Sequence, residues 1–292
     1  MKKIIILFSI FILSSLTSFA QSQYEQMQAI MVIINSSELY LKNLQSQNNE
    51  SDYKALKGAL QDIVDTKSNF DLNKFSNAIQ VIISLAEKSD IASHLAGTAY
   101  EYGISLKQDL NKAEKFYILA GENNAVAQLS LCKLYFRYGN DALIQKGISI
   151  CEKWIKDPLC KHYFQGILGE HLLYSKSKKE ATQGFELLCD SLKSKESPRT
   201  LVSIALAYSE GLGVETNPQK AVEHLLIAVK KFNDAEAKAI LAMAYLTGIG
   251  VPENKQNIKE AERLAKEAYE AGYSDATIIL EKINPKYAPK KN

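Results

Sequence analysis

One helical position recurs five times along this chain, at separations of 35, 37, 36 and 37 residues. The residues at that position are Tyr100, Tyr135, Leu172, Tyr208 and Tyr245. A period of this length is typical of proteins built from helix–turn–helix repeats. One such unit cannot bury its apolar face alone, so it stacks on its neighbours and helps to form an extended binding surface. The period therefore predicts an all-α protein made of stacked helix pairs.

Two segments show the repeat most clearly, residues 100–120 and 208–228. In both, glycine follows the tyrosine by three positions and alanine follows it by thirteen, twenty and twenty-seven: Gly103, Ala113, Ala120 and Ala127 in the first, Gly211, Ala221, Ala228 and Ala235 in the second. A spacing of seven keeps residues on one face of a helix over two turns. Small side chains on that face let a neighbouring helix approach closely, and the glycine supplies the left-handed residue that ends a helix.

Residues that favour helix starts stand where the repeat needs them. Asp109 and Asn217-Pro218 precede the second helix of their units, and Ser197-Pro198 precedes a first helix. Each unit is therefore predicted to hold a helix A of about 13 residues, a tight turn and a helix B of about 14. The loop at 250–261 is three residues longer than its counterpart, and such insertions often serve recognition.

The full pattern resembles a known family. A small residue three before the tyrosine, then Tyr-x-x-Gly-x-Gly-Val, an acidic or Asn cap and Ala-x6-Ala, is similar to the Sel1-like repeat, a relative of the tetratricopeptide repeat. Gly211–Val214 and Gly248–Val251 match best, and the resemblance covers residues 91–283. It implies a right-handed αα-hairpin solenoid that binds other proteins and is not an enzyme.

The two middle units, 125–160 and 161–198, depart from this pattern. Gly139 stands one residue late, and Gly147 and Gly184 replace the alanine at the helix–helix contact. The loops of these units are not defined by the sequence.

Residues 21–90 are predicted to form an N-terminal helical cap with a degenerate repeat. Asp71 to Lys74 repeats the letters of Asp109 to Lys112, whereas Ala78, Leu85 and Ala92 show the seven-residue spacing in a register three residues different. A further helix is expected at 22–46, shielding the first open face of the stack.

The two ends of the chain are predicted to lie outside the fold. Residues 1–20 have a basic start, an apolar run and Ser18-Phe19-Ala20, which together predict a signal peptide cleaved after Ala20. We therefore expect a periplasmic or secreted protein with no stable membrane insertion after cleavage, since no later run is long enough to span a bilayer. Residues 284–292 are expected to form a basic tail.

Charge argues against one class of partner. Without Lys2 and Lys3 of the leader, 33 basic side chains balance 33 acidic ones. Nucleic-acid binders need clustered Lys and Arg to displace counterions from phosphates, so no nucleic acid is expected as a partner.

Four cysteines, Cys132, Cys151, Cys160 and Cys189, fall in the two degenerate units. An even count in an exported chain suggests disulfides. Counting residues along the predicted hairpins places Cys132 opposite Cys151. A second disulfide, between Cys160 and Cys189, would then link the two helices of the next hairpin. Cys151 with Cys160 is the competing pairing, similar to the short-spaced bridges of cysteine-rich relatives. Four reduced thiols in the core are the remaining possibility.

We find no catalytic, cofactor or metal motif in the sequence. The four histidines and the cysteines lack the spacings of zinc or redox sites. Ser-x-x-Lys occurs at Ser51 and at Ser175, and some cysteine-rich relatives carry a β-lactamase label. The alternative function is therefore weak hydrolysis of β-lactams or cell-wall fragments, although S-D-N and K-T-G elements are absent.

The resemblance also implies which residues line a binding groove for a protein or peptide. If the family's small residue between helices is Gly97, Cys132, Gly169, Ala205 and Ala242, the groove positions follow by helical spacing. They are His94, Glu101, Lys133, Phe136, Tyr163, Glu170, Arg199, Ser209, Met243 and Leu246. Such a mixture of polar, aromatic and thioether side chains suits a protein-binding surface. Proteins that this chain resembles include envelope-assembly factors and periplasmic immunity proteins.

Overall fold

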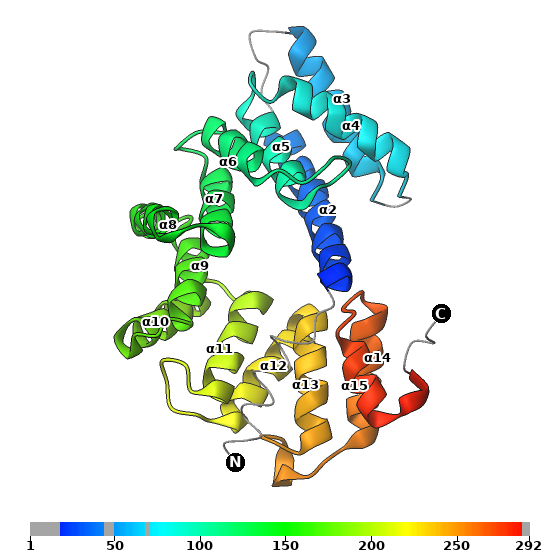
Figure 1. Ribbon diagram of the computed structural model, residues 1–292, viewed down its shortest axis with the longest axis vertical. Helices are drawn as coiled ribbons and strands as arrows, with labels where there is room; N and C mark the ends of the chain where they lie inside the picture. The colour runs from blue at the N-terminus through cyan, green and yellow to red at the C-terminus, as the bar shows by residue number, and fades with distance from the viewer. Residues whose placement is uncertain (1–17, 44–49, 68–69, 288–292) are drawn as a thin grey trace. The chain divides into compact units, whose positions relative to one another are not determined.

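The computed structural model describes residues 18–43, 50–67 and 70–287. In these ranges the chain is helical, with no β-strand (Figure 1). The α-helices are α2 (Ser18–Asn43), α3 (Glu50–Asp65), α4 (Leu72–Leu85), α5 (Asp90–Tyr102), α6 (Leu110–Leu119), α7 (Ala125–Tyr138), α8 (Asp141–Trp154), α9 (Lys161–Leu173), α10 (Lys178–Ser194), α11 (Pro198–Glu210), α12 (Pro218–Phe232), α13 (Ala235–Thr247), α14 (Ile258–Glu270) and α15 (Ala276–Ile283), and two 3₁₀ turns are η1 (Pro252–Asn254) and η2 (Pro285–Tyr287). Most of the predicted signal peptide, residues 1–17, lies outside the described residues.

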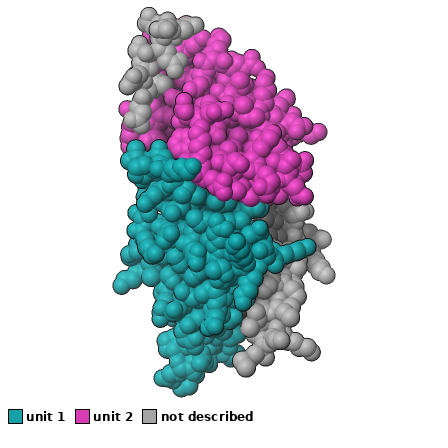
Figure 2. All heavy atoms as spheres, turned by 90° about the vertical axis from the view of Figure 1, so that its left-hand side faces the viewer, with its two compact units in different colours: residues 1–24, 155–292 teal, residues 25–154 magenta. Residues whose placement is uncertain are grey.

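The chain divides into two compact units, which are coloured separately in Figure 2. The N-terminal unit comprises residues 25–154, and the C-terminal unit comprises residues 155–292 together with 1–24. Within each unit the helices pack in chain order. In the N-terminal unit α3, α4, α5, α6, α7 and α8 each contact the next, and in the C-terminal unit the same holds from α9 to α15. This order of contacts is the one predicted for stacked helix pairs.

Alternate helices also touch. α5 contacts α7 in the N-terminal unit, while α9, α11, α13 and α15 contact one another successively in the C-terminal unit. These are the A helices of their pairs, apart from α15, which follows the last pair. We call the A helices that touch in this way, α5 and α7 in the N-terminal unit and α9, α11 and α13 in the C-terminal unit, the helix-A layer of each unit.

The turns between A and B helices follow the predicted repeat. Gly103, Gly211 and Gly248 end α5, α11 and α13 in the left-handed conformation, with φ of 66°, 75° and 77°. Backbone amides of Asp109 and Asn217, nine residues after the repeat tyrosine, donate to the carbonyls of Tyr100 and Tyr208. In the last pair the donor to Tyr245 is Asn257, twelve residues on. The predicted three-residue insertion is therefore confirmed, and it contains η1.

The second glycine of the Gly-x-Gly pattern allows each turn to contact the preceding pair. A Cβ atom on Gly213 would lie 2.1 Å from the carbonyl oxygen of Ala181, and one on Gly250 would lie 2.3 Å from that of Pro218. Both glycines also have positive φ. Only glycine tolerates both the close backbone contact and the positive φ, so these two glycines allow successive repeats to pack against each other.

The degenerate units use glycine differently. On α9 and α10, a Cβ on Gly169 would meet the carbonyl oxygen of Gly184 at 2.8 Å, and a Cβ on Gly184 would lie 2.6 Å from the backbone nitrogen of Leu173. The two helices therefore cross in direct backbone contact. Gly139 has φ of −76° and Tyr174 has φ of −93°, so α7 and α9 both end without the left-handed glycine that ends α5, α11 and α13.

The N-terminal helices settle the register that the sequence left open. The side chain of Asp71 accepts bonds from the amides of Asn73 and Lys74, and α4 begins directly after it. Asp109 caps α6 in the same way, so the Asp-Leu-Asn-Lys letters mark equivalent helix starts. Ala29, Ile33 and Ile34 of α2 share one hydrophobic core with α3, α4 and α5.

The folded part of the chain extends further toward the C-terminus than the predicted tail boundary at residue 284. Tyr287 packs against the core of the C-terminal unit and donates a hydrogen bond of 2.6 Å to Glu262 of α14. Lys266 lies over its ring, 5.3 Å from the centroid. Residues up to Tyr287 therefore belong to the folded unit, and Lys290 and Lys291 lie outside the described residues.

Candidate protein-binding surface

His94 was expected in an open groove, and the structure places it in the interior of the N-terminal unit. It is 0 % exposed. Tyr40 Oη of α2 lies 3.1 Å from its Nδ1, and Ser130 Oγ of α7 lies 3.2 Å from its Nε2. Burial, with a smaller contribution from the charge of Lys133, lowers the pKa of His94 to about 4. α2 therefore covers this end of the helix-A layer, which spacing along α5 alone does not reveal.

Glu101, the second predicted groove residue of α5, is also buried, with 2 % of its surface exposed. Tyr117 Oη of α6 donates to its Oε2 over 2.7 Å. Its other oxygen, Oε1, has no hydrogen-bond partner among the described residues. Burial raises the pKa of Glu101 despite the nearby charges of Arg137 and Lys133. His94 and Glu101 are thus interior polar groups, and their assignment to an exposed groove is wrong.

On α7 one of the two predicted groove residues is exposed and the other packs against the neighbouring helix. Lys133 is exposed. Phe136 instead packs on α8, where a Cβ added to Gly147 would lie 2.9 Å from its ring. Arg137 takes the position next to Glu101, and its guanidinium carbon lies 5.9 Å from the ring of Tyr102 and 5.7 Å from that of Tyr138.

The C-terminal unit presents charged and aromatic side chains on α9 and α11. Arg199 Nε donates to both carboxylate oxygens of Glu170, at 2.8 and 2.9 Å, and Ser203 also donates to this carboxylate. Tyr163 is 48 % exposed, and Lys195 donates to its hydroxyl over 3.1 Å while lying above its ring. These contacts organise a polar surface that includes three of the predicted residues: Tyr163, Glu170 and Arg199.

The remaining predicted positions are less accessible. Met243 is only 8 % exposed, and Leu246 packs against the hydrophobic core, so both serve packing between helices. Ser209 is partly exposed at the end of α11.

The cysteines occupy different environments. Cys132 and Cys151 are buried and face each other between α7 and α8, and the Cys132 thiol lies 3.5 Å from the carbonyl oxygen of Gly147. A hydrogen bond with Cys132, and then burial, raise the pKa of the Cys151 thiol far above its usual range. Cys160 stands at the start of α9, whereas Cys189 packs on the core between α10 and α11. All four are free thiols in the structure, so the pairings stay predictions.

Oxidation of Cys132 and Cys151 is the pairing best supported by contact. We expect the protein, purified under oxidising conditions, to be 2 Da lighter per bridge, by intact mass, than after reduction. Closing the loop between them would stabilise the N-terminal unit by about 3 kcal/mol in the chain-entropy model. Cys132→Ser should then lower the free energy of unfolding by that amount under oxidising conditions and by much less in reductant, while an equal loss in both would contradict the bridge.

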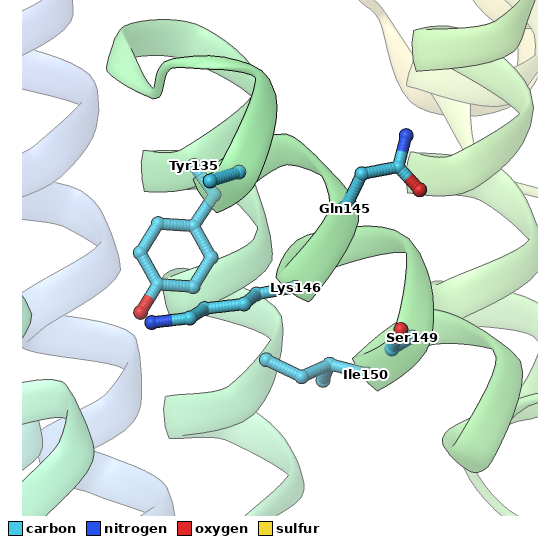
Figure 3. A pocket seen from close by; sticks show the side chains of 6 residues that line it. Tyr135, Gln145, Lys146, Ser149 and Ile150 are labelled. Atoms are coloured by element: carbon cyan, nitrogen blue, oxygen red, sulfur yellow. The ribbon is translucent and has the colours of Figure 1, made fainter.

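The N-terminal unit also has an open hollow of about 440 Å³ on α7 and α8 (Figure 3). It is lined by Tyr135, Ala142, Gln145, Lys146, Ser149 and Ile150. Tyr135 donates from its hydroxyl to Glu114 of α6 over 2.8 Å. The lining offers no acid–base pair or activated nucleophile. We therefore do not assign catalysis to it.

Two further observations bear on chemistry. Within the described residues, no group of three His, Cys, Asp or Glu side chains is arranged to hold a metal ion. The hydroxyl of Ser175 donates to Glu180 and accepts from the amide of Ser177, which caps the start of α10. This serine therefore has a structural role at a helix end. Ser51 is exposed on α3.

No helix in the described part of the chain combines the length and the apolar character needed to cross a bilayer.

Comparison with known proteins agrees with the repeat. The Sel1 repeat model matches residues 91–124, 202–231 and 235–273. No curated protein matches the chain. A Sel1 repeat protein from Oxalobacter formigenes has a similar crystal structure, with a TM-score of 0.51 and 23 % identity, over 80 % of this chain and 92 % of that one.

A second similar structure is c5321, a protective antigen of uropathogenic Escherichia coli strains that displays an SLR fold. The TM-score is 0.52 and the identity 18 %, over 88 % of this chain and 58 % of that one. At these identities the structures support the all-α repeat fold.

Proposed function

Because the chain is a Sel1-like repeat protein, we propose that it is an exported scaffold that binds another protein through its helix-A layers. Sel1-like repeat proteins bind other proteins and are typically not catalysts. The observation that carries the proposal is the arrangement of Tyr163, Glu170 and Arg199. Tyr163 and Arg199 are exposed, whereas only 15 % of the Glu170 side chain is exposed, and the three residues come from two adjacent A helices and are held in place by an ion pair and hydrogen bonds. Ordered polar and aromatic side chains of this kind are common at protein interfaces.

The proposed location is the periplasm or the outside of the cell, after removal of residues 1–20. The leader-like sequence supports this placement. Fractionation and N-terminal sequencing should find the mature chain outside the cytoplasm with Gln21 first. A chain that keeps Met1 and stays in the cytoplasm would contradict it.

The proposed biological role is envelope assembly or immunity to a toxic secreted protein. Both roles require one stable protein partner. The tagged mature chain, incubated with envelope extract, should retain one partner, and light scattering of the purified complex should give a one-to-one mass. Absence of any stable partner from envelope and secreted fractions would overturn the proposed function.

The hydrolase alternative predicts a different result. Purified protein should then hydrolyse nitrocefin, and Ser51→Ala or Ser175→Ala should abolish the activity. We expect no turnover above that of the buffer, because the contacts of Ser175 are those of a helix cap.

A further inference from the structure

Two helix pairs place an aromatic ring and a lysine on the repeat tyrosine. In the pair α5–α6 the ring of Phe116 stacks on that of Tyr100, with 5.6 Å between the centroids and 17° between the planes. Lys112 Nζ lies over the same tyrosine ring, 5.0 Å from its centroid. The pair α11–α12 repeats this arrangement, with 5.9 Å and 12° for the two rings and 5.2 Å for the lysine, and its residues are Tyr208, His224 and Lys220.

The small residue at the helix–helix contact identifies the equivalent positions in the pair α7–α8. In the two pairs above, the lysine directly precedes the alanine at this contact, and the stacked ring follows the alanine by three residues. In α8 Gly147 replaces the alanine, and its carbonyl oxygen lies 3.5 Å from Cys132 Sγ of α7. Lys146 is therefore equivalent to the two lysines, and Ile150 is equivalent to the stacked ring.

The pair α7–α8 thus has an aliphatic side chain where two other pairs have a ring. The open hollow of about 440 Å³ lies at this place, and Tyr135, Lys146 and Ile150 line it together (Figure 3). The turn before α8 comprises only residues 139–140, whereas the loops before α6 and α12 have seven residues each, so less of the chain is available to cover the tyrosine. In the last pair the equivalent residue is Leu264, which is buried in the core, while Ile150 is partly exposed.

The charges around the hollow favour an uncharged aromatic group. Lys146 is exposed, extends from α8 toward Tyr135 in Figure 3, and makes no ion pair with another described residue. Glu114 of α6 accepts the hydrogen bond of the Tyr135 hydroxyl and adds a negative charge nearby. An anionic ligand would be repelled by this carboxylate, whereas the face of an aromatic ring attracts the Lys146 ammonium without that penalty.

We infer that the hollow on α7 and α8 binds an aromatic side chain of the protein partner, an inference that rests on the proposed scaffold function. The ring occupies the place that Phe116 and His224 take in their own pairs, against Ile150 and the rim of Tyr135. The Lys146 ammonium lies over its exposed face. The volume lies in the range of ligand sites, about 300–1,000 Å³. Because α8 is a B helix, this contact is additional to those of the helix-A layer.

The test compares N-acetyl-tryptophanamide with N-acetyl-leucinamide, titrated into the mature protein and followed by saturation-transfer NMR. The tryptophan amide should bind about tenfold more tightly than the leucine amide. Ile150→Phe should weaken its binding at least about tenfold, because the new ring fills the hollow from within as Phe116 does in its pair. Lys146→Gln should weaken it roughly two- to fivefold. Lys153→Gln, an exposed lysine of α8 outside the lining, is the matched control and should leave the affinity unchanged.

Thermal unfolding of each variant shows whether the fold is intact. If Ile150→Phe does not fold, Ala142→Phe at an exposed position of the lining blocks the same space and should give the same loss. Equal binding of the two amides would overturn the inference, as would equal affinities of wild type and the folded blocking variant, or equal losses in Lys146→Gln and Lys153→Gln.

A captured partner separates this inference from the scaffold function. A partner that binds wild type and the folded blocking variant equally would show that none of its side chains occupies the hollow, and the scaffold function would stand. Failure to capture any partner, with the tryptophan amide still bound, would instead refute the scaffold function.

Discussion

Replacing Gly184 with alanine is expected to destabilise the C-terminal unit by about 3 kcal/mol. The added methyl group would lie 2.6 Å from the backbone nitrogen of Leu173 and 2.8 Å from the carbonyl oxygen of Gly169. Both neighbours are backbone atoms of α9, so relief requires α9 and α10 to move apart. The gain in helix propensity from alanine, about 1 kcal/mol, offsets only part of this cost. Urea unfolding measured at equilibrium gives the difference directly.

Gly166→Ala on α9 is the matched control for this experiment. Its added methyl group would meet the Ser191 hydroxyl at 3.4 Å and the Thr200 hydroxyl at 3.7 Å, which are ordinary contacts. We expect it to be neutral or to stabilise the unit by up to about 1 kcal/mol. Equal free energies of unfolding for the two variants would show that α9 and α10 do not cross in backbone contact.

Acid is expected to destabilise the N-terminal unit through His94, by up to about 3 kcal/mol between pH 6.5 and pH 4. In the folded chain burial lowers the pKa of His94 from 6.5 to about 4. As the pH falls below 6.5, the unfolded chain binds a proton at this position and the folded chain does not. Stability is therefore lost across this interval, and the loss is complete near the folded pKa.

Groups from three helices face His94 and must be considered with it. They are Tyr40 of α2, Tyr117 of α6, and Ser130 and Lys133 of α7. Glu101 acts in the opposite direction, because a raised carboxyl pKa in the folded state favours folding as the pH falls. The decisive quantity is consequently the difference between wild type and His94→Gln, followed by denaturant unfolding at pH 7, 6, 5 and 4.5. Parallel stability curves would contradict a neutral, buried histidine.

The turns and helix starts of the regular repeats could be predicted because they depend on local residues. A left-handed glycine ends α5, α11 and α13. Asp109, Ser197 and Asn217 cap the starts of α6, α11 and α12, as the sequence predicted. The three-residue insertion before α14 also follows from counting residues. Such signals need no knowledge of distant contacts.

The binding surface could be predicted only in part, because it depends on contacts between distant segments. The cover that α2 places over His94 joins residues 54 positions apart through Tyr40. Phe136 and Arg137 illustrate a second difficulty: adjacent residues on a helix point about 100° apart, so a register error of one exchanges core for surface. Two spacings in the sequence could have identified Arg137. It lies 36 residues after Glu101, which is one repeat, and one helical turn after Lys133.

Site-specific photo-cross-linking tests most directly whether the helix-A layer binds a protein. p-Benzoylphenylalanine would replace either Tyr163 on α9 or Tyr269 on α14, which are 48 % and 51 % exposed and so closely matched. We predict that irradiation in cells gives one defined adduct from position 163 and none from position 269. Adducts from position 269 alone, or no adduct from either position, would contradict binding through the layer of A helices.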